Sequence, residues 1–254
     1  MMTKIAVISD LHANALALNM CLKEIKKINV DLLICLGDIL TYGTKPNEVI
    51  QELLEYQKKN DLIMIKGNHE EFYFSSSEIS QQDYSLPNFV EESINWTKVN
   101  LQFEDLKTLF SWRESFIFKD IFFAHANPFE YGNWSYVETD QQIDDALQSL
   151  KRKNLMCGVF GHSHRQYIRK GKKLMKNTCN TVLDEIEEPL IVNTGSAGQP
   201  RGSGFCYSLI KIDSRKIYID LKEFSPNIEE NIKDVYLTEM SNNTKSKLEE
   251  YLRK

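Results

Sequence analysis

The chain has 254 residues, of which 42% are hydrophobic and 26% charged, as in a soluble globular protein with a sizeable core. A formal net charge of −5 without a long basic run argues against general binding of nucleic acid or membrane surfaces. No stretch approaches the roughly 20 apolar residues of a membrane span. The N-terminus lacks signal-peptide features and the five cysteines contain no CxxC pair, so we expect a cytoplasmic protein with reduced thiols.

Strands and helices alternate through the first half of the chain. Residues 4–10, 31–38 and 62–70 are rich in Ile, Leu and Val and predict strands. A helix follows the first strand, with Asn14 as its cap, and Pro46 suits the first turn of a second helix. Three successive strand–helix units predict a largely parallel sheet.

Residues 71–118 interrupt this alternation. A polar stretch is followed by two predicted helices, around 88–100 and 103–112, so we expect a helical insertion that shapes access to a site. Strands are predicted again from residue 121, over 121–126, 156–162, 190–196, 205–213 and 216–224, and we expect the late ones to be antiparallel.

The last part of the chain, 226–254, predicts a polar, amphipathic helical tail. We find no internal repeat and no composition shift that marks a boundary. A single domain over residues 1–254 is therefore expected.

All five histidines directly follow a predicted strand, as do two aspartates and one asparagine: His12, His69, His125, His162, His164, Asp10, Asp38 and Asn68. Ligands bind at the carboxyl ends of strands in open α/β sheets, so these side chains can converge on one rim. Taken singly, each is explained as a cap, a turn residue or a core residue. Together, crowded carboxylates and imidazoles need a cation to offset them, and the set predicts a metal site.

The donor types narrow the choice of metal. Nitrogen and oxygen donors without cysteine suit Mn²⁺, Fe²⁺/³⁺, Zn²⁺ or Ni²⁺ in a catalytic centre, and we expect Mn²⁺ to support activity in vitro. The donors exceed what one tetrahedral ion needs. Two ions about 3.5–4 Å apart that share a carboxylate would use them all, and such a pair activates a bridging water and holds a phosphoryl group.

The motifs that carry these residues resemble the calcineurin-like metallophosphoesterase superfamily, in its small bacterial phosphoesterase type. They are DLH (10–12), GD (37–38), GNHE (67–70), His125 and GHSH (161–164), and NTGSAGQPR (193–201) is similar to the NPGSxxxPR stretch of small bacterial members. The resemblance implies a four-layer α/β/β/α sandwich of two mixed β-sheets flanked by helices.

The resemblance also implies a role for each residue. Asp10, His12 and His164 would hold one metal, Asn68, His125 and His162 the other, and Asp38 would bridge them. His69 would be a non-ligand that stabilises the transition state and protonates the departing oxygen, after attack by a metal-bridging hydroxide.

Substrate contacts are less constrained by the sequence. Asn14, Arg165 and Arg201 are candidates, although a helix cap explains Asn14 and solvated surface positions explain the arginines equally well. Tyr42 and the aromatic residues at 72–74 could stack on a base, although such residues more often pack.

Departures from the family pattern bear on the substrate. Protein phosphatases and symmetrical dinucleoside-tetraphosphatases carry GDxxDRG, whereas residues 37–43 read GDILTYG, and Ala13 replaces the Gly of DxHGN. This disfavours protein dephosphorylation and leaves a phosphodiesterase, a phosphomonoesterase or an asymmetrical dinucleoside polyphosphate hydrolase.

We therefore expect hydrolysis of a small phosphorylated molecule, such as a nucleotide. The alternatives are a non-catalytic metal-binding scaffold and a nuclease, although the acidic balance argues against extended nucleic-acid binding. The oligomeric state is left open, a homo-oligomer included.

Overall fold

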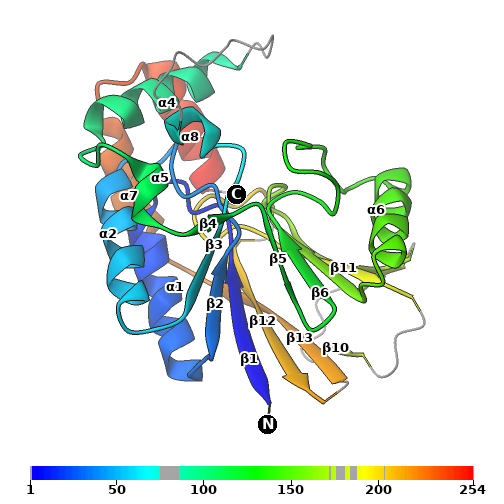
Figure 1. The fold of residues 1–254 in the computed structure, drawn as a ribbon. Coiled ribbons are helices and arrows are strands. Elements are labelled where there is room, and N and C mark those ends of the chain that lie inside the picture. Colours follow the sequence, from blue (N-terminus) through cyan, green and yellow to red (C-terminus); the bar gives the residue numbers. More distant parts are fainter. Residues whose placement is uncertain are drawn as a thin grey trace.

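Two β-sheets packed face to face form the centre of the molecule in the computed structural model (Figure 1). The structure describes residues 2–74, 86–171, 173–175, 181–183, 188–202, 204–214 and 216–253. Sheet A has the order β10 (Thr181–Leu183), β13 (Lys216–Phe224), β12 (Phe205–Asp213), β1 (Thr3–Ile8), β2 (Leu32–Cys35), β3 (Leu62–Ile65) and β4 (Trp112–Arg113). Sheet B has the order β5 (Ser115–Phe118), β6 (Ile121–Ala124), β7 (Cys157–Phe160), β11 (Leu190–Thr194), β8 (Gln166–Lys170) and β9 (Lys173–Met175).

Both sheets are mixed, as predicted. In sheet A, β1, β2 and β3 run parallel, with Ile5 opposite Leu32 and Leu33 opposite Leu62. The hairpin of β12 and β13 joins this parallel part antiparallel to β1. In sheet B the expectation of antiparallel late strands is wrong for two pairs, because β7 runs parallel to both β6 and β11. Between β7 and β11 the chain forms β8 and β9 in this sheet and β10 in sheet A.

Helices cover the outer face of each sheet, which completes the predicted four layers (Figure 1). On sheet A, α1 (Ala15–Ile28) and α2 (Pro46–Gln57) contribute Leu18 and Val49 to one apolar layer. On sheet B, α6 (Asp140–Arg152) contributes Ile143 to another. Between the sheets lies a third layer that includes Val7 and Phe123. Strands buried on both faces explain the nearly continuous apolar runs in the sequence.

The stretch 71–118 is only partly helical, which corrects the expected insertion. It contains α3 (Glu71–Phe74), α4 (Asn88–Asn100) and α5 (Leu106–Leu109). The helix predicted over 103–112 ends at Leu109, because Trp112 pairs with Met64 and adds β4 to the edge of sheet A. The next strand, β5, then pairs with β6 at the edge of sheet B. The polar stretch 75–85 lies outside the described residues.

Two further helices, α7 (Ile228–Tyr236) and α8 (Asn242–Leu252), lie where the helical tail is predicted. They pack with α4 at the upper end of sheet A (Figure 1), in an apolar cluster that includes Ile94, Val235, Leu248 and Tyr42. The single-domain organisation stays a prediction. Among the helices of the described residues, none is long and apolar enough to cross a membrane.

Candidate metal centre

The loops that leave β1, β2, β3, β6 and β7 meet at one rim of the sandwich and carry every histidine of the chain. The backbone turns sharply there, since five of the predicted ligands have a positive φ: Asp10 (55°), His12 (44°), Asp38 (53°), His162 (63°) and His164 (58°). Left-handed conformations of this kind cost about 1–3 kcal/mol each and cluster at functional sites. They aim successive side chains into one space, which a regular strand cannot do.

One set of donors consists of Asp10, His12 and His164, all buried. The Nε2 atoms of His12 and His164 are 3.1 Å apart. Asp10 Oδ1 lies 3.2 Å from His164 Nε2 and 3.9 Å from His12 Nε2. This is the trio that the family resemblance places around one ion.

A second set consists of Asp38, His125 and His162, with Asn68 beside them. His125 Nε2 lies 3.3 Å from Asp38 Oδ2, 3.2 Å from His162 Nδ1 and 3.1 Å from Asn68 Oδ1. Asp38 also forms a group with His12 and His69 whose donor atoms all lie within 4.8 Å of one another. The two histidines of the GHSH motif thus belong to different sets, and Asp38 lies between them.

The hydrogen bonds of the histidine rings decide which nitrogen faces the centre. Each of four rings places one nitrogen against a backbone carbonyl: His12 Nδ1 with Leu40 (3.0 Å), His125 Nδ1 with Leu36 (2.8 Å), His162 Nε2 with Trp134 (2.9 Å) and His164 Nδ1 with Gln199 (2.5 Å). A carbonyl oxygen only accepts, so that nitrogen carries the proton. In a neutral ring the other nitrogen presents a lone pair to the centre, in the manner of metal-binding histidines.

These lone pairs fit a bound cation. Without one, the lone pairs of His12 and His164 face each other across 3.1 Å. Asp10 Oδ1 is buried without a hydrogen-bond partner in the described part of the chain, and such an atom costs about 1–3 kcal/mol. The donors present therefore match a metal site with nitrogen and oxygen ligands.

The pKa values in the centre follow from burial and from the opposite charges. Burial raises the pKa of the Asp10 carboxyl, but the opposite charge of a protonated His164 outweighs burial and holds that pKa below its usual value. At Asp38 burial is likewise outweighed, chiefly by His125, and the pKa lies well below its usual value. Burial lowers the pKa of His12 and brings that of His162 to about 3. Ionised carboxylates and neutral imidazoles are the forms that bind metal.

His125 shows how strongly this position attracts positive charge. Burial alone would lower its pKa, but the charge of Asp38, the hydrogen bond with Asp38 and the charge of Asp10 raise it to about 9.

His69 lies beside the shared carboxylate but differs from the other four histidines. Its Nε2 is 3.9 Å from Asp38 Oδ2, while its Nδ1 meets the hydroxyl of Thr41 (3.0 Å) instead of a carbonyl. Burial lowers the pKa of His69. Its backbone N–H donates to Asp38 Oδ1 (2.8 Å), which fixes the two loops relative to each other.

Glu70 supports the centre from behind, a role that its sequence motif alone does not reveal. Its carboxylate accepts backbone N–H bonds from Asp38 (2.8 Å), Ile39 (2.8 Å) and Gly67 (2.5 Å). Burial and the charge of Asp38 raise the pKa of Glu70 to about 7, against the effect of these three donors. The GNHE motif places an acid there, and two of its three partners, Asp38 and Ile39, come from a different loop.

The three candidate substrate residues are placed differently. Asn14 Oδ1 accepts from the Ala17 N–H (3.1 Å), which makes it the predicted cap of α1, and its Nδ2 donates to the Gly198 carbonyl (2.8 Å). Arg165 is exposed and forms an ion pair with Glu138 (3.0 Å).

Arg201 lies closer to the centre. Its backbone N–H donates to the His164 carbonyl (3.4 Å), and its guanidinium lies 5.4 Å from the ring centroid of Tyr251. Its Nε is buried without a hydrogen-bond partner among the described residues.

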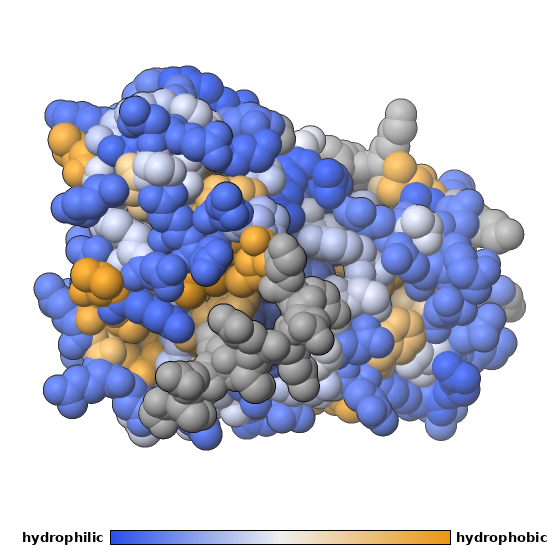
Figure 2. All heavy atoms as spheres, turned by 90° about the horizontal axis from the view of Figure 1, so that it is seen from above, coloured by the Kyte–Doolittle hydropathy of each residue, from blue (hydrophilic) through white to orange (hydrophobic). Residues whose placement is uncertain are grey.

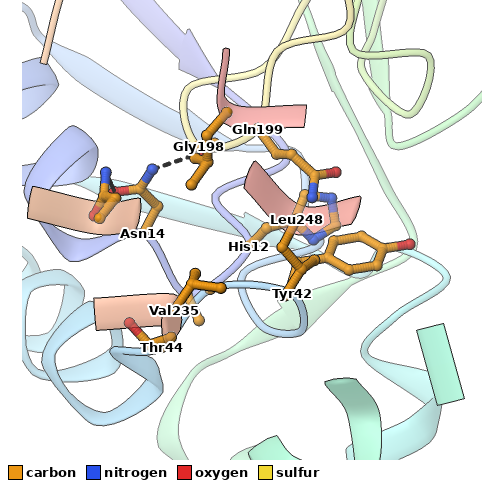
Figure 3. A pocket seen from close by; sticks show the side chains of 12 residues that line it. His12, Asn14, Tyr42, Thr44, Gly198, Gln199, Val235 and Leu248 are labelled. Carbon is orange, nitrogen blue, oxygen red and sulfur yellow. Dashed lines mark hydrogen bonds between the residues drawn. The ribbon is translucent and has the colours of Figure 1, made fainter. Parts of the chain in front are cut away.

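A pocket adjoins His12 on the side of the C-terminal helices. Figure 3 shows Val235 and Leu248 among the residues that line it, with Tyr42 near His12 and with Asn14 bonded to Gly198. The Tyr42 ring centroid lies 4.7 Å from that of His12 and 5.2 Å from that of His69. Seen from above, the molecular surface is mainly hydrophilic, with apolar side chains in separate patches (Figure 2).

Comparisons with known proteins agree with this geometry. Residues 3–215 match the profile of the calcineurin-like phosphoesterase superfamily domain. The chain is 31% identical over 240 residues to an uncharacterized protein of Methanocaldococcus jannaschii, an alignment that covers 89% of this chain and 92% of the relative.

Two solved structures share the fold. A metallophosphoesterase from Sphaerobacter thermophilus is 23% identical, with 98% of each chain covered and a TM-score of 0.75. A hypothetical protein from Pyrococcus horikoshii is 15% identical, with 97% of each chain covered and a TM-score of 0.75. The family match includes both donor sets and ends before α7 and α8.

Proposed function

This chain belongs to the calcineurin-like phosphoesterase superfamily and is a hydrolase of phosphate esters, and from that premise we propose that it uses two metal ions to cleave a small phosphorylated molecule such as a nucleotide. The reaction class is a phosphodiester, phosphomonoester or asymmetrical dinucleoside polyphosphate hydrolysis.

The observation that carries the proposal is the pair of donor sets that meet at Asp38. In this assignment one ion is held by Asp10, His12 and His164, the other by Asn68, His125 and His162, and Asp38 is common to both. The donor chemistry suits Mn, Fe, Zn or Ni, with Mn²⁺ as the first choice for an assay. Bound metal ions supply a nucleophile from water and neutralise charge that develops on phosphorus.

The side chains around the ions have separate tasks in this proposal. His69 gives a proton to the departing oxygen as the phosphorus–oxygen bond breaks, a general-acid role for an imidazole. Its position beside Asp38, with the Nε2–Oδ2 distance of 3.9 Å, places it at the edge of the donor cluster. Arg201 supplies a guanidinium for a phosphate oxygen, since its buried Nε has no partner among the described residues.

The overall charge of the chain favours a small substrate over a nucleic acid. The net charge of −5 argues against tracking along a nucleic acid.

The free cysteines of the described residues fit the proposed cytoplasmic location, where the surroundings are reducing. Cys21, Cys35, Cys157 and Cys206 are free and buried, while Cys179 lies outside the described residues.

The test is turnover by protein loaded with Mn²⁺ on bis-p-nitrophenyl phosphate and on a panel of nucleotides and dinucleoside polyphosphates. Asp38→Ala removes the shared ligand, and Asp61→Ala, at an exposed position, is the matched control. We expect turnover by the wild type and by Asp61→Ala and background rates from Asp38→Ala. Wild-type rates no higher than those of Asp38→Ala would reject the proposal.

A further inference from the structure

A contact with Thr41 distinguishes His69 from the other four histidines of the centre. His12, His125, His162 and His164 each direct one nitrogen to a backbone carbonyl, whereas His69 Nδ1 lies 3.0 Å from Thr41 Oγ1. The Thr41 hydroxyl is in turn 2.7 Å from the Tyr73 hydroxyl. A short chain of polar atoms therefore leads from the imidazole away from the donor cluster.

The backbone of Thr41 is strained to make this contact. Thr41 is fully buried and has a φ of +75°, a conformation that is a genuine outlier for a β-branched residue. Holding such a residue there costs about 1–3 kcal/mol. Thr41 C=O accepts from the Gly43 N–H (2.9 Å), a tight turn that presents the side chain to His69.

We propose that Thr41 is a positioning residue that fixes the tautomer and the orientation of His69 for proton donation, with Tyr73 holding the Thr41 hydroxyl. The inference rests on the proposed role of His69 as the general acid. A hydroxyl both donates and accepts, so its role here depends on Tyr73. In the proposed arrangement Thr41 O–H donates to the Tyr73 oxygen, which leaves Thr41 Oγ1 as an acceptor for His69 Nδ1–H. The Nδ1 proton then stays on the ring, and the proton on Nε2, on the side of Asp38, is the one transferred.

The step balances with groups already named. The oxygen of a water that has lost a proton to solvent forms a bond to phosphorus. The bond between phosphorus and the leaving oxygen breaks, and its electron pair stays on that oxygen. The oxygen takes the proton from His69 Nε2, and the ring becomes neutral with its Nδ1–H still on Thr41. The ring regains a proton from solvent before the next turnover.

The geometry also explains why a hydroxyl is needed at this position. The site of Thr41 is closed to solvent, so no water replaces the hydroxyl if it is removed. In Thr41→Val, which has nearly the same shape, His69 Nδ1 faces a methyl group, and the ring loses its preference for the Nδ1–H tautomer. Thr41→Ser keeps the hydroxyl and should restore it.

The experiment compares two phosphate diesters that differ in their leaving group, with Mn²⁺-loaded enzyme. An alkoxide leaving group needs a proton from the enzyme, whereas p-nitrophenolate leaves without one. We expect Thr41→Val to lower kcat about 100-fold on the alkyl ester and less than about threefold on the p-nitrophenyl ester. We expect Thr41→Ser to be within about threefold of wild type on both esters and Tyr73→Phe to show a smaller, equally selective loss.

The matched control is Thr194→Val, which removes another buried threonine hydroxyl, one that donates to the Val7 carbonyl (2.9 Å) away from His69. It should show no leaving-group dependence. In addition, ¹⁵N chemical shifts of His69 should report the Nδ1–H tautomer in wild type and in Thr41→Ser and a mixture of tautomers in Thr41→Val. This readout does not depend on turnover.

Two results would overturn the inference. One is an equal loss on both esters in Thr41→Val, and the other is an unchanged His69 tautomer in that variant. Either would leave the proposed function intact as long as the wild type turns over. Absence of turnover by the wild type is a different outcome, which would reject the proposed function itself.

Discussion

Two buried asparagines join α7 to the loops of the metal centre. Replacing them should lower the free energy of unfolding, and the effects of the two substitutions should be coupled. Asn231 Nδ2 donates to Asn14 Oδ1 (3.0 Å), the same oxygen that caps α1, and Asn14 Nδ2 donates to the Gly198 carbonyl. Gly198 precedes Gln199, whose carbonyl holds the Nδ1 of His164. The C-terminal helices are thus hydrogen-bonded to the segment that orients a predicted ligand.

The loss in free energy of unfolding can be estimated for each substitution from the hydrogen bonds that it removes. Asn14→Ala loses a helix cap worth about 1 kcal/mol and leaves the Gly198 carbonyl and the Asn231 amide unpaired, for a total of about 3 kcal/mol. Asn231→Ala should cost about 1 kcal/mol, because Asn14 Oδ1 still accepts from Ala17. The double variant should therefore show a coupling free energy of about 1 kcal/mol.

The assay is urea unfolding of the two single variants and the double variant in EDTA, followed by circular dichroism, so that metal binding does not contribute. Asn242→Ala, at an exposed position at the start of α8, is the control. A coupling free energy below about 0.3 kcal/mol would show that the two asparagines do not act together. So would an Asn231→Ala variant as stable as the control.

Three further predictions concern the centre itself. His162→Gln and His164→Gln should each lower the metal content from two ions to one, and each should leave a different donor set intact. Metal analysis of the purified variants tests this, and loss of both ions in either variant would contradict it. Gly198→Ala should unfold more readily than Gly132→Ala, because a Cβ at Gly198 would lie 1.8 Å from the Leu11 carbonyl oxygen. At Gly132 nothing lies within 4 Å, and only its φ of +91° disfavours alanine; equal melting temperatures would contradict the prediction. Chelation with EDTA should lower Tm by about 5–10 °C, since a ligand at 100 times its Kd stabilises by about 2.7 kcal/mol, and an unchanged Tm would argue against a metal bound to the folded state.

The sequence was sufficient to bring the donor residues to one rim. Asp10, Asp38 and His125 each follow an apolar strand, and parallel strands present their carboxyl ends at the same edge. Periodicity also located α1 and α2 with their first residues, because Asn14 and Pro46 are local start signals whose effect needs no tertiary partner.

The sequence did not predict the strands at the sheet edges. Trp112 and Arg113 form β4 only because β3 offers an unpaired edge, so nothing in their own pattern separates them from the end of a helix. In the same way, β11 runs parallel to β7 after the intervening strands β8, β9 and β10, which the pattern did not reveal. Pairings of this kind are tertiary and override local propensity.

The supporting residues were missed for a related reason. Glu70 accepts from the N–H groups of Asp38 and Ile39, more than 30 positions earlier in the chain, and its role exists only once two loops meet. Thr41 of GDILTYG stands where the GDxxDRG pattern has its second aspartate. The sequence alone shows only that this aspartate is absent. The structure shows what the replacement contacts, namely the Nδ1 of His69.

The metal donors and the residues of the pocket wall come from different parts of the chain, which bears on substrate specificity. Both donor sets lie within residues 3–215, the part that matches the family, whereas Val235 and Leu248 in the pocket wall come from α7 and α8 beyond it. Tyr42 packs in the same apolar cluster as these two residues and also lies against His12 and His69. A change in the C-terminal helices would therefore reach the centre through Tyr42, and we expect it to alter which leaving group fits more than it alters metal binding. Activity of a chain truncated or substituted in α7 and α8 on several phosphate esters would test this expectation, and an equal loss on all of them would contradict it.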